Sequence, residues 1–259
     1  MEETMTAACE FDRLFTKSVL HIHEKIFFSL DYESFKKCLE VSKSWNDLLT
    51  SESFLRRGKS VFREDIQKEL LLAAERGNTD IIRRVLSSFM VDINWIGLNW
   101  IGSPLMVAAD NGHQDVVQLL LDRGAEPNMA DQIGFTPLHD AAGKGQKDVV
   151  KLLLDREANP NIAEQNGITP LANAARGGHK DVVQLLLDRG AEPNMADPFG
   201  WTPLHEAAYK GHKDMVQLLL DRGAEPNMAT QYGRTALSYA FQNGHMDIAN
   251  ILTKNGRTV

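Results

Sequence analysis

The chain has 259 residues, of which 43% are hydrophobic and 24% are charged, a composition typical of folded rather than disordered or fibrous proteins. Its formal net charge is −7, which disfavours a surface for nucleic-acid phosphates. No apolar run approaches the roughly 18 residues of a membrane-spanning helix, so no membrane span is expected.

The first ten residues are polar and are predicted to be disordered. The start of the chain, MEETMTAACEFDR, is acidic and lacks the basic and apolar stretches of a secretory signal peptide. Only two cysteines are present, Cys9 and Cys38, too few for a disulfide framework. A reducing environment, in the cytoplasm or the nucleus, is therefore expected.

Residues 11–62 are predicted to form a compact helical module. Apolar residues recur at helical spacing between Ile22 and Leu30, which indicates one amphipathic helix. Two further short helices are predicted after a polar break, one beginning at Phe35 and one carrying Trp45.

The order of these features resembles an F-box. In that family an apolar helix is followed by Leu-Asp and then by a second helix ending in Val-Cys-x-x-Trp. Here Leu-Asp stands at residues 30–31, and the sequence VSKSW stands at residues 41–45, with serine in place of the cysteine. The chain departs from the family at residues 18–19, where Ser-Val replaces the Leu-Pro of many F-boxes.

This resemblance implies that the module docks the Skp-type adaptor of a Skp–cullin–F-box ubiquitin ligase, and through it the cullin ligase core. The alternative is an ordinary three-helix cap, since repeat arrays need polar-faced ends. The expected docking residues are the apolar ones on its helices: Val19, Ile22, Ile26, Phe27, Leu30, Phe35, Val41 and Trp45.

Residues 63–68 form a short charged connector without glycine or serine, and we expect it to be stiff. From residue 69 to residue 259 a different pattern holds. The sequence Thr-Pro-Leu-His begins at residues 136 and 202, and weaker copies begin at residues 103, 169 and 235, so the period is 33 residues.

A 33-residue period with this signature resembles the ankyrin-repeat family. The resemblance implies stacked helix–turn–helix units joined by β-hairpin-like fingers. The predicted fold is thus mainly α, an ankyrin-repeat solenoid preceded by the small F-box-like module. About six repeats are expected, at residues 69–101, 102–134, 135–167, 168–200, 201–233 and 234–258.

The clearest repeat, from Gly200 to Ala229, shows why such a unit folds. Thr202 is placed to cap a helix whose first position is Pro203, where the missing N–H costs nothing. Gly211 is expected to end this helix in the left-handed conformation. A second, leucine-rich helix follows, and only neighbouring repeats can cover its wide apolar face.

No catalytic, cofactor or metal constellation is visible, so the chain is not expected to be an enzyme. Six of the eight histidines fall at equivalent repeat positions. The ankyrin resemblance implies that His139 and His205 brace the capping threonine and the neighbouring finger. His-Ile-His-Glu at residues 21–24 resembles part of a zinc motif, yet no Cys-x-x-Cys follows it.

Binding is the better-supported role. Residues 69–259 carry 17 Lys and Arg against 23 Asp and Glu, which favours a protein partner over nucleic acid. Among the near-identical repeats, differences concentrate at finger tips and on first helices, although drift on an exposed face would also produce them. The predicted partner-binding residues are Ile133, Phe135, Lys144, Ile168, Arg176, Phe199, Trp201, Tyr209, Lys210, Tyr232 and Arg234.

The aromatic residues around Tyr209 are expected to form an exposed binding hot spot with Arg234 nearby. The alternative for Trp201 is that it packs against the adjacent finger and is partly buried.

Together the two resemblances imply a substrate-recognition adaptor of an F-box ubiquitin ligase, with the array holding an unknown protein substrate. The main alternative is a plain ankyrin scaffold without a ligase role. An elongin-binding SOCS-box adaptor is a related alternative, although that box normally follows the repeats.

Overall fold

The computed structural model describes residues 67–87, 91–96 and 102–256, which all belong to the second of the two units into which the chain divides, Arg63–Val259. The F-box-like module predicted for residues 11–62 lies outside the described residues, and so do its eight expected docking residues and the predicted disorder of residues 1–10.

The described part of the chain is helical, as the mainly α prediction required. Residues 67–75 form the first described helix. The helices that follow are α5 (Thr79–Leu86), α6 (Pro104–Asp110), α7 (Gln114–Asp122), α8 (Pro137–Gly143), α9 (Lys147–Asp155), α10 (Pro170–Gly177), α11 (Lys180–Asp188), α12 (Pro203–Lys210), α13 (Lys213–Asp221), α14 (Ala236–Gln242) and α15 (Met246–Asn255).

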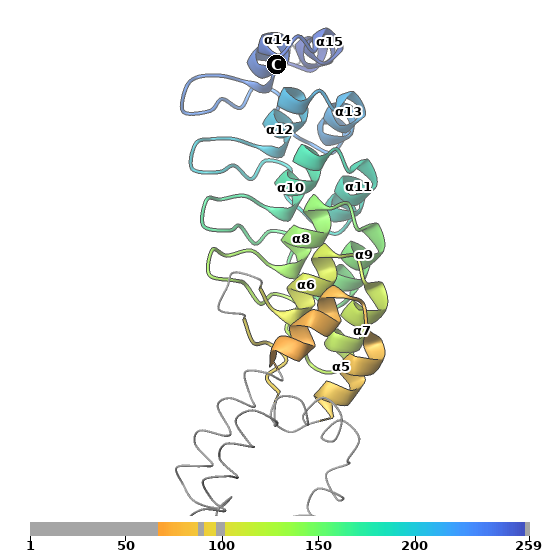
Figure 1. Ribbon diagram of the computed structural model, residues 1–259. Coiled ribbons are helices and arrows are strands. Elements are labelled where there is room, and N and C mark those ends of the chain that lie inside the picture. The colour runs from red at the N-terminus through yellow and green to blue at the C-terminus, as the bar shows by residue number, and fades with distance from the viewer. Residues whose placement is uncertain (1–66, 88–90, 97–101, 257–259) are drawn as a thin grey trace, which may run out of the picture. The chain divides into compact units, whose positions relative to one another are not determined.

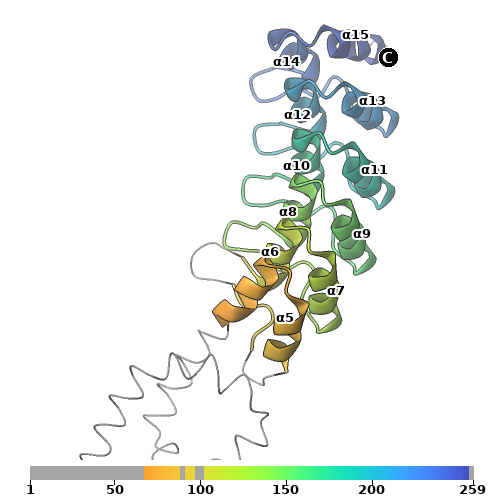
Figure 2. The ribbon, with the colours of Figure 1, turned by 45° about the vertical axis from the view of Figure 1, so that its right-hand side comes forward.

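These helices stack in two rows (Figure 1). The even-numbered helices α6 to α14 form an inner row beside the projecting fingers, and the odd-numbered helices α7 to α15 form an outer row behind them. The turned view in Figure 2 shows the same order. From α6 onward each inner helix begins 33 residues after the previous one, so the period of the sequence is the period of the stack.

The inner helices begin and end where the local chemistry predicts. The Thr202 side chain accepts a hydrogen bond from the His205 N–H at 3.4 Å, and Pro203 occupies the first helical position of α12. Gly211 then ends α12 with a φ of 81°, a left-handed conformation that glycine adopts without strain.

The core runs continuously between the two rows. The inner helices α6 to α12 each present a pair of alanines, such as Ala207 and Ala208 of α12, which are 0% exposed and let the neighbouring backbones approach closely. The leucine of each signature, Leu204 in α12, is 1% exposed. Because every repeat buries its apolar face only against its neighbours, the stack is stable as a unit.

The fingers are turns rather than strands. The predicted β-hairpin-like character is limited, within the described residues, to one isolated antiparallel bridge between Ala229 and Thr235. Neighbouring fingers are in close contact, because the Gln165 N–H donates to the Ile133 carbonyl at 2.9 Å. A Cβ on Gly134 would lie 3.0 Å from the Glu164 Cα, so this finger requires glycine.

Two sets of side-chain contacts link successive repeats at the ends of the outer helices and in the loops that follow them. Asn161 accepts a hydrogen bond from the Glu192 N–H at 2.9 Å and donates to the Gly190 carbonyl at 3.0 Å, and Asn194 repeats the pattern one unit later. Ion pairs of 2.7 Å join the ends of the outer helices: Arg156–Asp122, Arg189–Asp155 and Arg222–Asp188. These pairs are one-third to one-half exposed, so solvent screens them and they contribute little to stability.

Candidate protein-binding face

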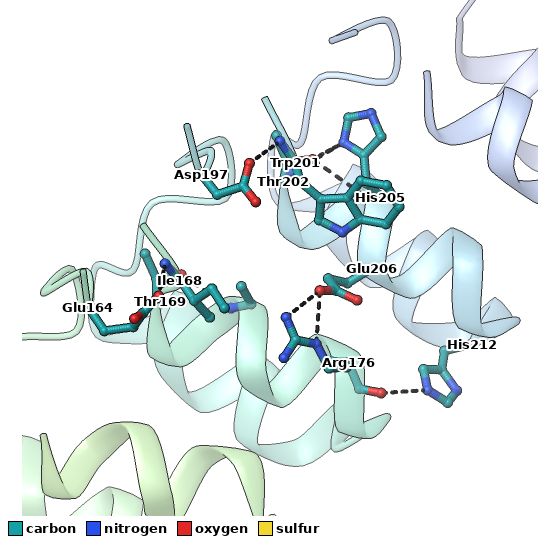
Figure 3. A network of polar contacts seen from close by, with 11 residues as sticks. Glu164, Ile168, Thr169, Arg176, Asp197, Trp201, Thr202, His205, Glu206 and His212 are labelled. Carbon is teal, nitrogen blue, oxygen red and sulfur yellow. Dashed lines mark hydrogen bonds and ion pairs between the residues drawn. The ribbon is translucent and has the colours of Figure 1, made fainter. Parts of the chain in front are cut away.

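A buried or half-buried acidic residue organises each of three fingers: Asp131, Glu164 and Asp197. Asp197 accepts hydrogen bonds from the backbone N–H groups of Phe199 and Trp201, at 2.9 and 2.8 Å. Glu164, which is 4% exposed, holds the N–H of Ile168 at 3.1 Å in the same way (Figure 3). The finger side chains are therefore presented in fixed positions, which lowers the entropy cost of binding a partner.

All of the predicted partner-binding residues lie on the fingers or on the inner helices, and together they define what we call the finger face. Phe199, Tyr209 and Tyr232 are 52%, 41% and 71% exposed. The residues that are only half-buried are Ile133, Phe135, Ile168 and Trp201, and the exposed charged ones are Lys144, Arg176, Lys210 and Arg234.

The signature histidines brace the fold. His139 Nδ1 accepts the Thr136 backbone N–H at 3.1 Å, and its Nε2 lies 3.1 Å from the Ile168 carbonyl of the next finger, as expected. Burial lowers the pKa of His139, which favours the neutral imidazole, whose Nδ1 can accept the Thr136 N–H while Nε2–H donates to the Ile168 carbonyl. His205 contacts Thr202 in the same way, but its buried Nε2 has no hydrogen-bond partner among the described residues.

A cluster of aromatic rings occupies the finger face between α12 and α14. The Trp201 ring centroid lies 4.4 Å from that of Tyr239 and 5.9 Å from that of Tyr209. The Tyr209 and Tyr239 centroids are 6.3 Å apart. Contacts of this kind stabilise a cluster by about 0.5–1.5 kcal/mol per pair beyond the area they bury.

Trp201 therefore differs from the expected exposed aromatic. It is half-buried among the rings of the inner helices, and its buried indole N–H has no partner among the described residues. Tyr239, which the sequence did not single out, is 7% exposed and completes the cluster. The signal was present in the sequence, because the fourth residue after the capping serine or threonine differs in every repeat from Val107 to Tyr239.

An ion pair crosses from α10 to α12 on this face. Arg176 donates to the Glu206 carboxylate through Nε at 2.9 Å and through a terminal nitrogen at 2.6 Å (Figure 3). The Glu206 side chain is only 9% exposed, whereas that of Arg176 is 43% exposed. Arg176, predicted as a partner-binding residue, is thus also a structural partner of a buried carboxylate.

The corresponding place between α6 and α8 has no such pair. Asp140 stands at the repeat position of Glu206, and Asp110 stands at that of Arg176. Burial raises the pKa of Asp140 to about 7, and the charges of Asp110 and Asp131 act in the same direction, while Lys144 opposes them. Lys144 itself pairs with Asp110 at 3.5 Å.

The face offers no metal-binding or membrane-spanning features in the part of the chain that the structure describes. No group of three or more His, Cys, Asp or Glu side chains is arranged to hold a metal ion there. None of the helices at residues 67–87, 91–96 or 102–256 has the length and apolar content to span a bilayer. The arrangement is one of exposed aromatic rings, cations and carboxylates on a rigid scaffold, which is suited to binding a partner.

Comparison with known protein families identifies ankyrin repeats in this chain. The family model described as ankyrin repeats, in three copies, matches residues 53–131, 105–197 and 189–259, which is more than half of the chain. The matched segments include every residue of the finger face.

A curated relative also matches over part of the array. Cortactin-binding protein 2 of Rattus norvegicus is 42% identical over 66 residues, which are 26% of this chain and 4% of that protein. The chain thus spans only a small fraction of the length of this relative.

Proposed function

Because this chain belongs to the ankyrin-repeat family, whose arrays are generally non-catalytic and mediate protein–protein interaction, we propose that it is the substrate-recognition adaptor of a Skp–cullin–F-box type ubiquitin ligase. The array would hold a protein substrate on the finger face, and the N-terminal module would dock the Skp-type adaptor and so recruit the cullin ligase core. The chain itself contributes no chemistry in this role.

Binding at the finger face is supported by one observation above others. The near-identical repeats differ mainly at fingers and inner helices, and there the side chains of Phe199, Tyr209 and Tyr232 are more than 40% exposed. Large exposed aromatics beside cations are the usual make-up of interface hot spots. A typical contact of about 800 Å² per partner extends over several such repeats.

The ligase role is supported by the sequence pattern of residues 18–45, in which Leu-Asp and Val-x-x-x-Trp follow an apolar helix at F-box spacing. An adaptor of this kind raises the effective concentration of a substrate lysine near the conjugating enzyme. A cytoplasmic or nuclear location goes with the role. The second candidate, a binding scaffold without a ligase role, needs only the array.

Co-expression of the full chain with a Skp-type adaptor tests the ligase role. We expect the two proteins to co-purify as a stable complex, and we expect the double substitution Ile26→Asp with Val41→Asp to abolish it by placing charge on the docking surface. Tyr232→Ala, on the finger face, is the matched control and should leave the complex intact. No complex, or one indifferent to the double substitution, would leave the scaffold role in its place.

Proximity labelling with the full chain tests the finger face. The double substitution Phe199→Ala with Tyr209→Ala should remove partners that the unsubstituted chain labels, because both side chains are exposed. Equal labelling by both forms would show that partners bind elsewhere.

A further inference from the structure

We propose that the finger face between α12 and α14 docks a protein segment that carries a carboxylate beside an apolar side chain. The docking residues are the exposed rings of Phe199, Tyr209 and Tyr232 and the cations Lys210 and Arg234, which we call the aromatic–cationic site. The inference rests on the proposed protein-binding role of this face and adds the chemistry of the partner.

The two cations of the site lack carboxylate partners. Neither Lys210 nor Arg234 forms an ion pair with any carboxylate of the described residues, although Arg234 donates a hydrogen bond to Gln242 at 2.8 Å. The other two cations of the predicted binding face, Lys144 and Arg176, both have one. The positive charge at the site is therefore available to an external anion.

The repeat positions explain why Lys210 is left without a carboxylate. Lys144, the equivalent residue two repeats earlier, pairs with Asp110 at the end of the preceding inner helix. The residue at that place before Lys210 is Arg176, which carries the same sign of charge and is already bonded to Glu206. A partner carboxylate would supply the charge that the array does not.

The exposed rings supply the apolar part of the site, and each cation of the site lies over a tyrosine ring, one in the site and one, the buried Tyr239, beside it. The Lys210 ammonium lies 5.6 Å from the Tyr209 ring centroid, and the Arg234 guanidinium lies 6.0 Å from that of Tyr239. Both distances are within the range of cation–π attraction. An acidic segment with a neighbouring apolar side chain can thus contact charge and ring together.

A protein segment fits these observations better than a nucleic acid does. Single-stranded nucleic acid also combines anions with stacking, but it requires a groove of many cations along its backbone. Here the array as a whole is acidic, with 17 Lys and Arg against 23 Asp and Glu in residues 69–259. Two cations suffice for one or two carboxylates and not for a phosphate chain.

Display selection of a random peptide library against the full chain tests the proposal. We expect the enriched peptides to carry Asp or Glu beside an aromatic or aliphatic residue.

Binding of one enriched, fluorescein-labelled peptide to the full chain is then measured by anisotropy. Lys210→Glu with Arg234→Glu should weaken it at least about tenfold, because both attractions become repulsions. The neutral pair Lys210→Gln with Arg234→Gln should give a smaller loss, and Lys151→Glu on α9 is the matched control. Thermal melts check that every variant is folded.

Three kinds of result from these experiments would overturn the proposal. Enrichment of basic or uncharged peptides, or binding unaffected by charge reversal, would contradict the acidic partner while leaving a protein-binding face intact. Failure to enrich any peptide would count against both the partner chemistry and the proposed role of the face. Binding of a poly-deoxythymidine oligonucleotide in preference to the enriched peptide would show that the site takes nucleic acid instead.

Discussion

The junction of α10 with α12 and the junction of α6 with α8 place the same pair of repeat positions together, but they fill it with opposite chemistry. At the first, Arg176 meets the buried carboxylate of Glu206 at 2.6 Å. At the second, Asp110 stands where Arg176 does, and the carboxyl it faces, that of Asp140, has a pKa raised to about 7.

The difference shows that, in a repeat scaffold, the positions of two contacting residues and the free energy of their contact are set independently. The backbone brings the end of each inner helix to the middle of the next, whatever side chains are there. The side chains then decide whether that contact stabilises the fold, as at Glu206, or opposes it, as at Asp140. A stable junction on one side lets an array tolerate a less favourable one nearby, because repeat stability is roughly a sum over neighbours.

The largest effect is expected from Arg176→Ala. It leaves the Glu206 carboxylate, whose side chain is 9% exposed, without its charged donor, and we expect the free energy of unfolding to fall by about 2–3 kcal/mol. Urea unfolding followed by circular dichroism measures the change. Adding Glu206→Gln should recover part of the loss, since a neutral amide is less costly to bury.

Lys144→Ala is the matched control at the other junction. Its ion pair with Asp110 is 59% and 41% exposed, so its loss is expected to cost less than about 1 kcal/mol. An equal cost for Arg176→Ala and Lys144→Ala would show that burial of Glu206 does not distinguish the two junctions.

The second-largest effect on stability is expected from Asp140→Asn, and it is a gain rather than a loss. The pKa of Asp140 is raised in the folded state, so the folded protein binds the proton more tightly and loses stability as pH rises from about 4 to about 7. The substitution should therefore stabilise the protein at pH 8 by at least about 1 kcal/mol and have little effect at pH 4. Thermal melts across this range measure it.

The control for that experiment is Asp148→Asn on the exposed start of α9, which should not stabilise the protein at pH 8, because an acid in the first turn of a helix is favourable. If Asp140→Asn destabilises the protein at pH 8, the carboxylate is stabilised in the folded state and the contrast between the junctions disappears.

Much of the fold followed from the sequence because a 33-residue period fixes both element order and neighbour contacts. The caps at Thr202 and Gly211 are local features, and local chemistry predicted them. The placement of the variable residues on the fingers and inner helices followed as well, whereas their role in binding a partner stays a prediction.

The parts that sequence reasoning missed depend on contacts between repeats. The bond from Arg176 to Glu206 joins residues 30 apart, a spacing that no single helix or turn displays. Trp201 is half-buried because Tyr239 of the next repeat packs against it, and that contact joins two different repeats. Exposure at one repeat is decided by the residue that its neighbour presents.

The smallest effect is expected from Gln146→His, at the same junction as Asp140. In other repeats a histidine at this position contacts the carbonyl 36 residues earlier, as His179 Nε2 does with Gly143 at 3.0 Å and His212 does with Arg176 at 3.2 Å. The Gln146 side chain has no hydrogen bond in the part of the chain that the structure describes.

Introducing the histidine would supply a donor for the Asp110 carbonyl, and we expect a gain of about 0.5–1 kcal/mol, typical of one added hydrogen bond. Urea unfolding at pH 8 measures it, with His179→Gln as the reverse substitution in an intact junction. The two changes should be similar in size and opposite in sign. A gain from Gln146→His without a loss from His179→Gln would mean that packing around the imidazole, rather than the bond to the carbonyl, makes the difference between the two junctions.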